Sequence, residues 1–498
     1  MHIGMSARPD RRHTSETEST ASMFKRRLDL WLPTYAMQAP RRLYGALRRR
    51  TALTHVIFLV CDHFEPRHAA QTQEQPFERM QAWHDGYARF QQRCMEAFGT
   101  RPLHTWFYPP HHGDEHLARL ANMVYDGLGE VELHYHHDGD TSETFRRDLR
   151  ATLAEYNRWG LLLESGRTPR TSFGFIHGDW ALDNSCHGRY CGVNDELTIL
   201  SEHGCWGDFT MPSANECQTR KINAVYYAID DPQRPKSHNW GRDARVGSID
   251  PDGFFLMQGP LAINWRAPGY PRIENANLTF DNWGRADRIQ RWIDCQVHVR
   301  GRPEWLFVKL HTHGAIERDF DALFGERAFE MHRVLNERYN DGERFRLHYV
   351  TARQAYNIAK AAEHGKTGDP SQWRDFVLQP QVNSRYCVDA RHKLTTCTED
   401  HLALVDLEAA QAVTFRTAIG PASVVVGRLS GIEVDGVRAS LRLTMPADAT
   451  ELKVRLNRGW TVSQVSGARV VGTSMSESAC DVSLIAEAMQ VEATFMRG

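Results

Sequence analysis

The chain lacks any apolar run that approaches the ~20 residues of a membrane-spanning helix. Residues 1–23 are polar, so the apolar core of a secretory signal is missing there too. Both absences lead us to expect a cytoplasmic protein.

An excess of charge is also absent, because 60 Lys and Arg stand against 62 Asp and Glu, a net charge of -2. A near-neutral chain without a basic aromatic stripe is not typical of nucleic-acid binding. The 10 cysteines form no compact framework, which in a chain this large is typical of reduced thiols. We therefore expect no nucleic-acid partner and no disulfide scaffold.

The 498 residues are too many for one ordinary core and predict two domains. Over residues 52–365, apolar β-type runs alternate with helical patterns and no hairpin signals occur, which predicts a parallel sheet of about seven strands, a number that a (β/α) barrel can hold. Within it, residues 231–282 lack periodicity and predict a long loop over the site. Residues 373–498 contain short runs separated by turns, which predicts a small all-β sandwich domain.

The N-terminal arm, residues 1–51, is expected to be disordered over residues 1–23 and basic beyond them. Residues 24–50 carry eight Lys and Arg against one Asp, mixed with apolar side chains. This segment either packs on the domain with a solvated basic face or makes peripheral contact with the inner face of the membrane. Pro33 and Pro40 exclude one continuous helix.

Polar side chains gather after the predicted barrel strands, where barrel enzymes keep their sites. The predicted strands are Thr54–Val60, Leu103–Tyr108, Val131–Tyr135, Ser172–Ile176, Phe209–Met211, Val225–Ile229, Trp305–Leu310 and Phe345–Val350.

Several of the 25 histidines follow these strands, and imidazole with carboxylate is the ligand set of a catalytic divalent metal. Such a site needs about three protein ligands and one open position. The predicted ligands are His63, His134 and either His137 or Asp138, with Asp62 as an alternative to His63, for one divalent ion: Zn²⁺, with Ni²⁺, Co²⁺ and Mn²⁺ as alternatives. Each histidine alone could equally be a hydrogen-bonded rim residue, so the prediction depends on their number.

Two residues are predicted to be catalytic. Asp62 is the candidate general base, because a carboxylate beside a metal can take a proton from water. Either His311 or His313 could be a general acid near neutral pH, although the two could also be a pair that only packs. The predicted substrate-binding residues are Tyr108, His112, His177, Asp179, Trp180 and His313.

A structural zinc site is a further possibility, among Cys186, His187, Cys191, Cys205 and Cys217. Their spacing differs from that of a standard zinc knuckle, which argues against it.

Three short motifs within residues 52–360 resemble the polysaccharide deacetylases (carbohydrate esterase family 4, chitooligosaccharide deacetylase-like). Ile57–His63 is similar to the first motif, an apolar strand ending in two aspartates, with Asp62 as the base and His63 in place of the second aspartate. Glu130–His134 is similar to the strand carrying the ligand histidine, and Val308–His311 to the strand carrying the general-acid histidine.

The resemblance implies a deformed (β/α) barrel with a single divalent metal. It implies a hydrolase that removes the acetyl group of an N-acetylated sugar or polysaccharide precursor, with Asp62 as base and His311 as acid. The partner it implies is a carbohydrate substrate.

Two other functions stay open. His311-Thr312-His313 is also similar to the His-x-His of amidohydrolases and of histidinol-phosphatase-like phosphoesterases, whose sites commonly hold two or three metals. A non-catalytic carbohydrate-binding scaffold on a degenerate barrel is the second, because His63 replaces an aspartate.

Overall fold

The computed structural model describes most of residues 27–381 and the strands between residues 402 and 497. Within the first range it does not describe residues 166–169, 214, 250–251 and 269–270. The disorder expected for residues 1–23 lies outside the described residues.

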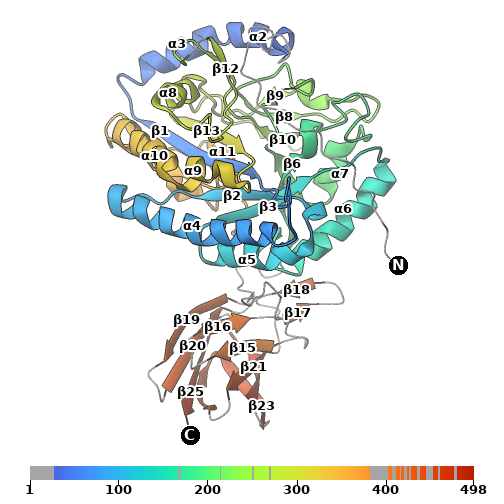
Figure 1. Cartoon of the computed structure of the whole chain (residues 1–498), viewed down its shortest axis with the longest axis vertical. Helices are drawn as coiled ribbons and strands as arrows, with labels where there is room; N and C mark the ends of the chain where they lie inside the picture. Colours follow the sequence, from blue (N-terminus) through green and yellow to red (C-terminus); the bar gives the residue numbers. More distant parts are fainter. Residues whose placement is uncertain are drawn as a thin grey trace.

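The first part of the chain is a mixed α/β unit around a ten-stranded, mostly parallel sheet (Figure 1). Its strands are β1 (Thr54–His63), β2 (His104–Tyr108), β3 (Gly129–Tyr135), β6 (Phe173–His177), β7 (Cys205–Asp208), β8 (Val225–Ala228), β9 (Arg242–Asp243), β10 (Phe254–Met257), β13 (Trp305–Thr312) and β14 (Phe345–Tyr349). The hydrogen-bonded order is β13-β1-β2-β3-β6-β7-β10-β8-β9, and β14 pairs with β1. No pair joins β13 to β9 among the described strands, so the structure shows no closed barrel and does not confirm the deformed (β/α) barrel that we expected.

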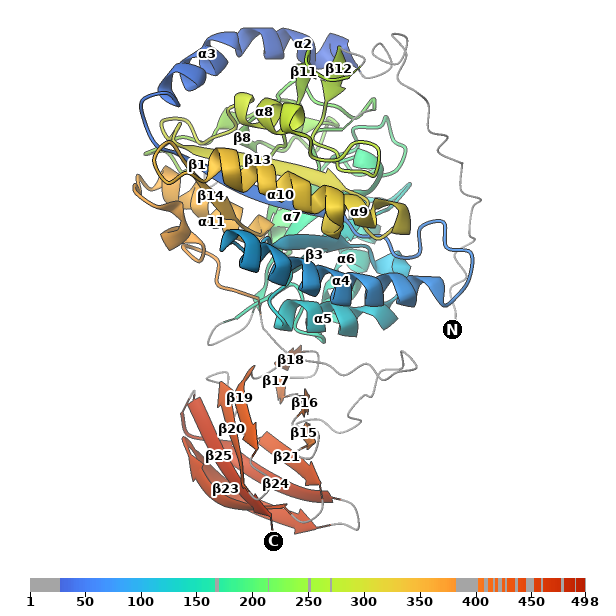
Figure 2. The ribbon, with the colours of Figure 1, turned by 60° about the vertical axis from the view of Figure 1, so that its left-hand side comes forward.

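Helices connect these strands and pack on the sheet (Figures 1 and 2). They are α4 (Gln75–Phe98), α5 (Leu117–Tyr125), α6 (Ser142–Asn157), α7 (Glu196–Glu202), α8 (Ala286–Asp294), α9 (Phe320–Phe324), α10 (Glu326–Tyr339) and α11 (Ala352–Glu363). The predicted alternation of strands and helices is confirmed for most of this part.

Side chains of β1 alternate between two cores, as the pleat of a strand requires. Val56, Phe58 and Val60 belong to a core that includes α4 and α5. Ile57 and Leu59 belong to a second core on the other face, together with residues of α11. At the carboxyl end of the strand, the same alternation sends neighbouring polar side chains to opposite faces.

Two strand predictions were wrong. The strand expected at Phe209–Met211 is β7, Cys205–Asp208, four residues earlier and less apolar than the predicted run. The segment 231–282, expected to be one long loop, contains β10 and the small hairpin of β11 (Ala262–Asn264) and β12 (Arg272–Glu274). Strand β10 is antiparallel to β8, whereas the sequence predicted parallel strands only.

The basic N-terminal segment forms two helices, α2 (Leu28–Met37) and α3 (Ala39–Arg48), which break at Gln38. Trp31 of α2 is buried, and Arg49 forms an ion pair with Asp294. The guanidinium of Arg41 donates to the carbonyl oxygen of Gln296. The described part of the segment therefore packs on the domain through Trp31, Arg41 and Arg49 and leaves other apolar side chains exposed.

The first unit continues past residue 365, where we placed its end. Residues 370–381 stay on it, because Asn357 of α11 accepts from the backbone of Leu378 at 2.8 Å. Gln381 also donates to the carbonyl oxygen of Val131 at 2.6 Å.

The C-terminal strands form two larger, mainly antiparallel sheets and a small sheet of β17 (Thr417–Ile419) and β18 (Ser423–Val425), in agreement with the all-β character predicted from the run lengths. The first has the order β16-β15-β21-β24-β23 and the second β19-β20-β25-β22. Their bounds are β15 (Leu402–Asp406), β16 (Gln411–Thr414), β19 (Arg428–Val434), β20 (Arg438–Thr444), β21 (Leu452–Asn457), β22 (Trp460–Ser466), β23 (Ala468–Met475), β24 (Ala479–Ala486) and β25 (Gln490–Arg497). The domain boundary itself stays a prediction.

No helix among the described residues has both the length and the apolar content needed to cross a membrane.

Candidate metal centre

The candidate centre lies at the carboxyl ends of β1 and β3, where three side chains point to one place. His134 is on β3, His136 follows the end of that strand, and Glu65 follows the end of β1. The Nε2 atoms of His134 and His136 are 3.0 Å apart. Glu65 Oε1 is 3.0 Å from the Nε2 of His136 and 3.5 Å from that of His134.

In each ring, the hydrogen bond at Nδ1 decides that the lone pair is on Nε2. His134 Nδ1 lies 3.0 Å from the carbonyl oxygen of Ile176, and His136 Nδ1 lies 3.3 Å from a carboxylate oxygen of Asp179. Both partners only accept hydrogen bonds, so both Nδ1 atoms carry hydrogen. In the neutral rings the Nε2 lone pairs then face each other and the carboxylate of Glu65. Three lone pairs at one point fit a bound cation.

The electrostatics of these side chains agree with a cation between them. Burial would raise the pKa of Glu65, but hydrogen bonds with His134 and His136 hold it well below its usual value. Burial would lower the pKa of His136, but Asp179 and Glu65 raise it to about 9. Positive charge is thus favoured between these groups.

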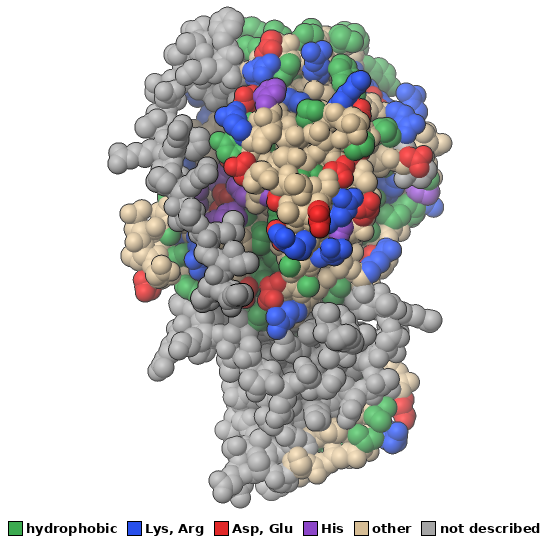
Figure 3. Space-filling view, turned by 90° about the vertical axis from the view of Figure 1, so that its right-hand side faces the viewer, with side chains coloured by type: hydrophobic (Ala, Val, Ile, Leu, Met, Phe, Trp, Pro, Cys, Tyr) green, Lys and Arg blue, Asp and Glu red, His purple; other side chains and the backbone are tan. Residues whose placement is uncertain are grey.

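The centre is open on one side. Glu65 and His134 are buried, whereas 29% of the His136 side chain is exposed. The exposed His111 also reaches the group, because its ligand atom lies within 4.8 Å of those of Glu65 and His136. Figure 3 shows histidine and acidic side chains together on one face of the molecule. Two imidazoles, a carboxylate and an open side are the features of a catalytic rather than a structural site.

Two further histidines and a tryptophan form the wall beside His134. The ring of His63 lies 4.8 Å from that of His134 and 4.8 Å from that of His313. Trp180 packs 5.8 Å from His63. The Nε2 of His63 is buried and has no hydrogen-bond partner among the described residues, so a polar group of a substrate could satisfy it.

The predicted base does not lie in this centre. Asp62 points to the opposite face of β1, where one oxygen is 2.9 Å from His104 Nε2. Its other oxygen accepts from the backbone N–H of Gly314 at 2.7 Å. The carboxylate is completely buried and both its oxygens are engaged.

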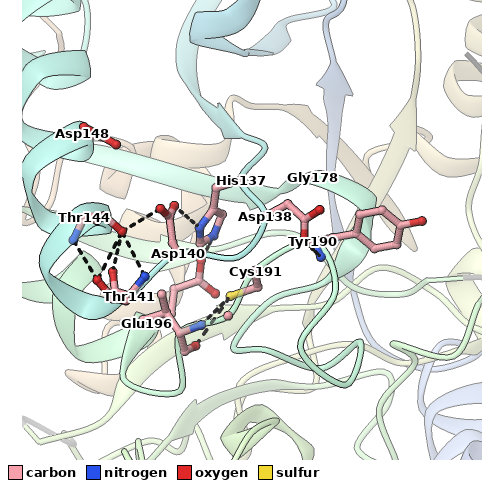
Figure 4. A network of polar contacts seen from close by, with 12 residues as sticks. His137, Asp138, Asp140, Thr141, Thr144, Asp148, Gly178, Tyr190, Cys191 and Glu196 are labelled. Atoms are coloured by element: carbon pink, nitrogen blue, oxygen red, sulfur yellow. Dashed lines mark hydrogen bonds and ion pairs between the residues drawn. The ribbon is translucent and has the colours of Figure 1, made fainter. Parts of the chain in front are cut away.

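The four predicted ligands do not come together. His134 and His63 lie at the centre, but His137 belongs to a second group with His177, Cys191 and Glu196. Asp138 accepts from the backbone N–H of Tyr190 at 2.8 Å (Figure 4). The side chains of consecutive residues leave β3 in different directions, which separates them.

The other predicted site residues have mixed positions. Asp179, Trp180 and His313 border the centre, and His311 lies behind them, its ring 6.2 Å from that of His63. Tyr108 donates to the carbonyl oxygen of Gly113. His112 accepts from the backbone N–H of Arg67. His177 belongs to the second group.

The residues missed by sequence reasoning are Glu65, His111, His136 and Glu196. The period of a strand could have found two of them, because Glu65 is two residues from His63 and His136 is two from His134. Glu196 and His111 follow irregular segments, so no periodicity in the sequence predicts where their side chains point.

Three groups of metal-type side chains occur among the described residues. The third, His55, His348 and Asp369, involves the amino-terminal part of β1, away from the centre. There His55 Nδ1 and His348 Nε2 are 2.9 Å apart and the two rings stack. A hydrogen-bonded pair of neutral histidines accounts for this arrangement.

No protein-family model, no curated protein and no solved structure matches this chain.

Proposed function

We propose that this chain is a metal-dependent hydrolase whose single catalytic metal is held by Glu65, His134 and His136. The observation that carries the proposal is that one carboxylate oxygen and two imidazole Nε2 atoms lie 3.0–3.5 Å apart at the carboxyl ends of β1 and β3, where the group is open on one side. The donor set fits zinc, with nickel, cobalt and manganese as alternatives. The finer description of the sheet as an open, deformed (β/α) barrel belongs to the same proposal.

A divalent cation at such a site lowers the pKa of water and polarises a carbonyl oxygen. The residues of this chain orient the ligands around it. Asp179 keeps hydrogen on the Nδ1 of His136, and the carbonyl of Ile176 does the same for His134. Such partners fix the ring orientation and the basicity of the ligand nitrogen.

We assign the proton transfers to His313 rather than to His311. The ring of His313 lies 4.8 Å from that of His63, which borders His134, and burial lowers the pKa of His313. The ring of His311 lies farther from His63, at 6.2 Å, and burial lowers its pKa as well. A neutral His313 would take a proton from the attacking water and then give it to the leaving amine nitrogen.

In this proposal Asp62 is a positioning residue. Its carboxylate accepts from the N–H of Gly314, the residue after His313. This contact holds the turn that presents His313. The general-base role predicted for Asp62 would require a carboxylate on the other face of β1.

We propose an N-acetylated sugar or polysaccharide precursor as the substrate. Trp180 beside His63 and His313 gives an apolar ring of the kind that stacks on sugars. The resemblance to polysaccharide deacetylases supports the same substrate class. The released product would be acetate and a free amine on the sugar.

The test is acetate release from N-acetylated oligosaccharides by zinc-loaded protein. His134→Ala should abolish release, and His313→Asn should lower the rate 10²- to 10⁴-fold, the usual range for a general acid–base residue. His311→Asn is the matched control and should retain most of the rate. Equal loss in both histidine variants would contradict the assignment to His313. Unchanged release in His134→Ala would contradict the proposed centre.

We also propose that α2 and α3 contact a membrane surface. Met37, Leu43 and Leu47 are 80%, 62% and 52% exposed. These exposed apolar side chains lie on helices that Arg41 ties to the domain through the carbonyl oxygen of Gln296. A helix that presents such a face can lie in the interface of a bilayer.

A further inference from the structure

A second metal-type group lies at the carboxyl ends of β3 and β6, and Figure 4 labels its members His137, Cys191 and Glu196. His177 ends β6, His137 lies two residues beyond β3, and these two strands are paired in parallel, with Tyr135 opposite His177. Cys191 and Glu196 come from the connection between β6 and β7, Glu196 being the first residue of α7. Four ligand atoms of these residues all lie within 4.8 Å of one another.

The rings in this group are oriented as ligands. His137 Nδ1 is 2.9 Å from a carboxylate oxygen of Asp140, and His177 Nδ1 is 2.5 Å from the carbonyl oxygen of Gly178. Both partners are acceptors, so both Nε2 atoms carry lone pairs in the neutral rings. These Nε2 atoms are 3.0 Å apart. Glu196 Oε1 is 3.0 Å from one and 3.3 Å from the other.

The thiol of Cys191 completes the group. Its sulfur accepts from the backbone N–H of Val193 at 3.4 Å and lies 3.6 Å from the carbonyl oxygen of the same residue. The other oxygen of Glu196 accepts from the N–H of Asp183 at 2.5 Å. Every ligand therefore has an outer partner that fixes its direction.

Burial distinguishes this group from the open centre. His177, Cys191 and Glu196 are 0% exposed, and 4% of the His137 side chain is exposed. Four protein donors in a closed environment are the pattern of a structural zinc site, and thiolate with imidazole favours zinc over harder cations.

We propose that His137, His177, Cys191 and Glu196 bind a structural zinc ion, separate from the catalytic metal. The chain would then hold two metals with different tasks. This proposal needs no hydrolase activity, since it concerns only metal binding and the connection after β6.

The connection that this site would hold has an unusual backbone. Six residues other than glycine have positive φ within residues 179–190, a region that side chains disfavour. They are Asp179, Trp180, Asp183, Asn184, His187 and Tyr190. Such a loop persists only where its surroundings fix it. A metal bound at both Cys191 and the strand ends would supply that restraint.

The same connection joins the two sites. The carbonyl oxygen of Gly178 accepts a hydrogen bond from the Nδ1 of His177 in the structural group. On its other side, a Cβ at Gly178 would overlap the ring of His136. The next two residues, Asp179 and Trp180, border the open centre. The structural zinc would therefore keep one wall of the catalytic centre in place.

The test is cobalt replacement in the full-length chain, read by absorption spectroscopy and metal analysis. A thiolate bound to Co²⁺ gives a charge-transfer band in the near ultraviolet, and only the second site contains a cysteine. We expect two equivalents of cobalt and this band in the wild type. Cys191→Ser should lose the band and one equivalent, whereas His134→Ala should lose one equivalent and keep the band.

Cys186→Ser is the matched control, because Cys186 is a buried cysteine in the same connection. It should keep two equivalents and the band. Glu196→Gln, which preserves the shape of the side chain, should weaken the second equivalent without unfolding the chain. A wild type without the band, or a band that survives in Cys191→Ser, would overturn the proposal. Failure of acetate release would leave these results unchanged and would count only against the hydrolase.

Discussion

Replacing the outer partners of the two metal groups separates the sites most cleanly. Asp179→Asn removes the carboxylate beside the Nδ1 of His136, and Asp140→Asn removes the one beside the Nδ1 of His137. Both substitutions keep the shape of the side chain. Because neither residue is itself a ligand, each should weaken one metal without abolishing its site.

The structure predicts which of the two substitutions weakens metal binding more. Loss of an outer carboxylate commonly costs 10- to 100-fold in metal affinity, about 1.4 to 2.8 kcal/mol. The Asp179 contact is 3.3 Å long and 49% of its side chain is exposed, so we expect a loss near tenfold. The Asp140 contact is 2.9 Å and its side chain is 20% exposed, so we expect a loss nearer 100-fold.

The assay is zinc competition against a chromophoric chelator, with each of the two equivalents fitted separately. Asp148→Asn is a matched control, since Asp148 is paired with Arg147 on the surface of α6. It should change neither affinity. The reasoning fails if both equivalents weaken together in either variant, or if neither weakens.

Three other predictions follow from separate parts of the molecule. Gly178→Ala should displace the ring of His136 and remove about one equivalent of metal, which mass spectrometry of the purified protein would detect. Burial lowers the pKa of His332 from 6.5 to about 3, so the unfolded chain binds an extra proton as pH falls below 6.5. Between pH 7 and pH 5 the free energy of unfolding should therefore fall by about 2 kcal/mol less in His332→Leu than in the wild type. Urea titrations followed by tryptophan fluorescence would measure both values, and an equal fall in the two proteins would count against a neutral His332. Leu43→Asp combined with Leu47→Asp should abolish co-sedimentation with anionic vesicles, and a wild type that does not sediment with them would exclude membrane contact.

The strand periodicity in the sequence predicted much of the parallel sheet. It gave β1, β2, β3, β6, β13 and β14 to within a few residues, because buried parallel strands are strongly apolar. It misplaced β7, in which Gly207 and Asp208 weaken the apolar signal. It missed β10 because the surrounding segment is rich in turn residues.

The candidate site could be predicted only in part for a similar reason. The sequence pointed to the correct ends of β1 and β3 and to His134. It could not show that His136 turns inward while His137 turns toward His177, because both lie beyond the last residue of the strand. Cys191 was considered as a zinc ligand, but its partners come from other strands, and sequence spacing does not reveal them.

Diffraction from zinc-loaded crystals at the zinc absorption edge would test the central claim most directly. We predict an anomalous peak between Glu65, His134 and His136, with open coordination toward the exposed side. A second peak should lie among His137, His177, Cys191 and Glu196. A fully loaded crystal with no peak at the first position would contradict the catalytic centre and leave a carbohydrate-binding scaffold as the better account.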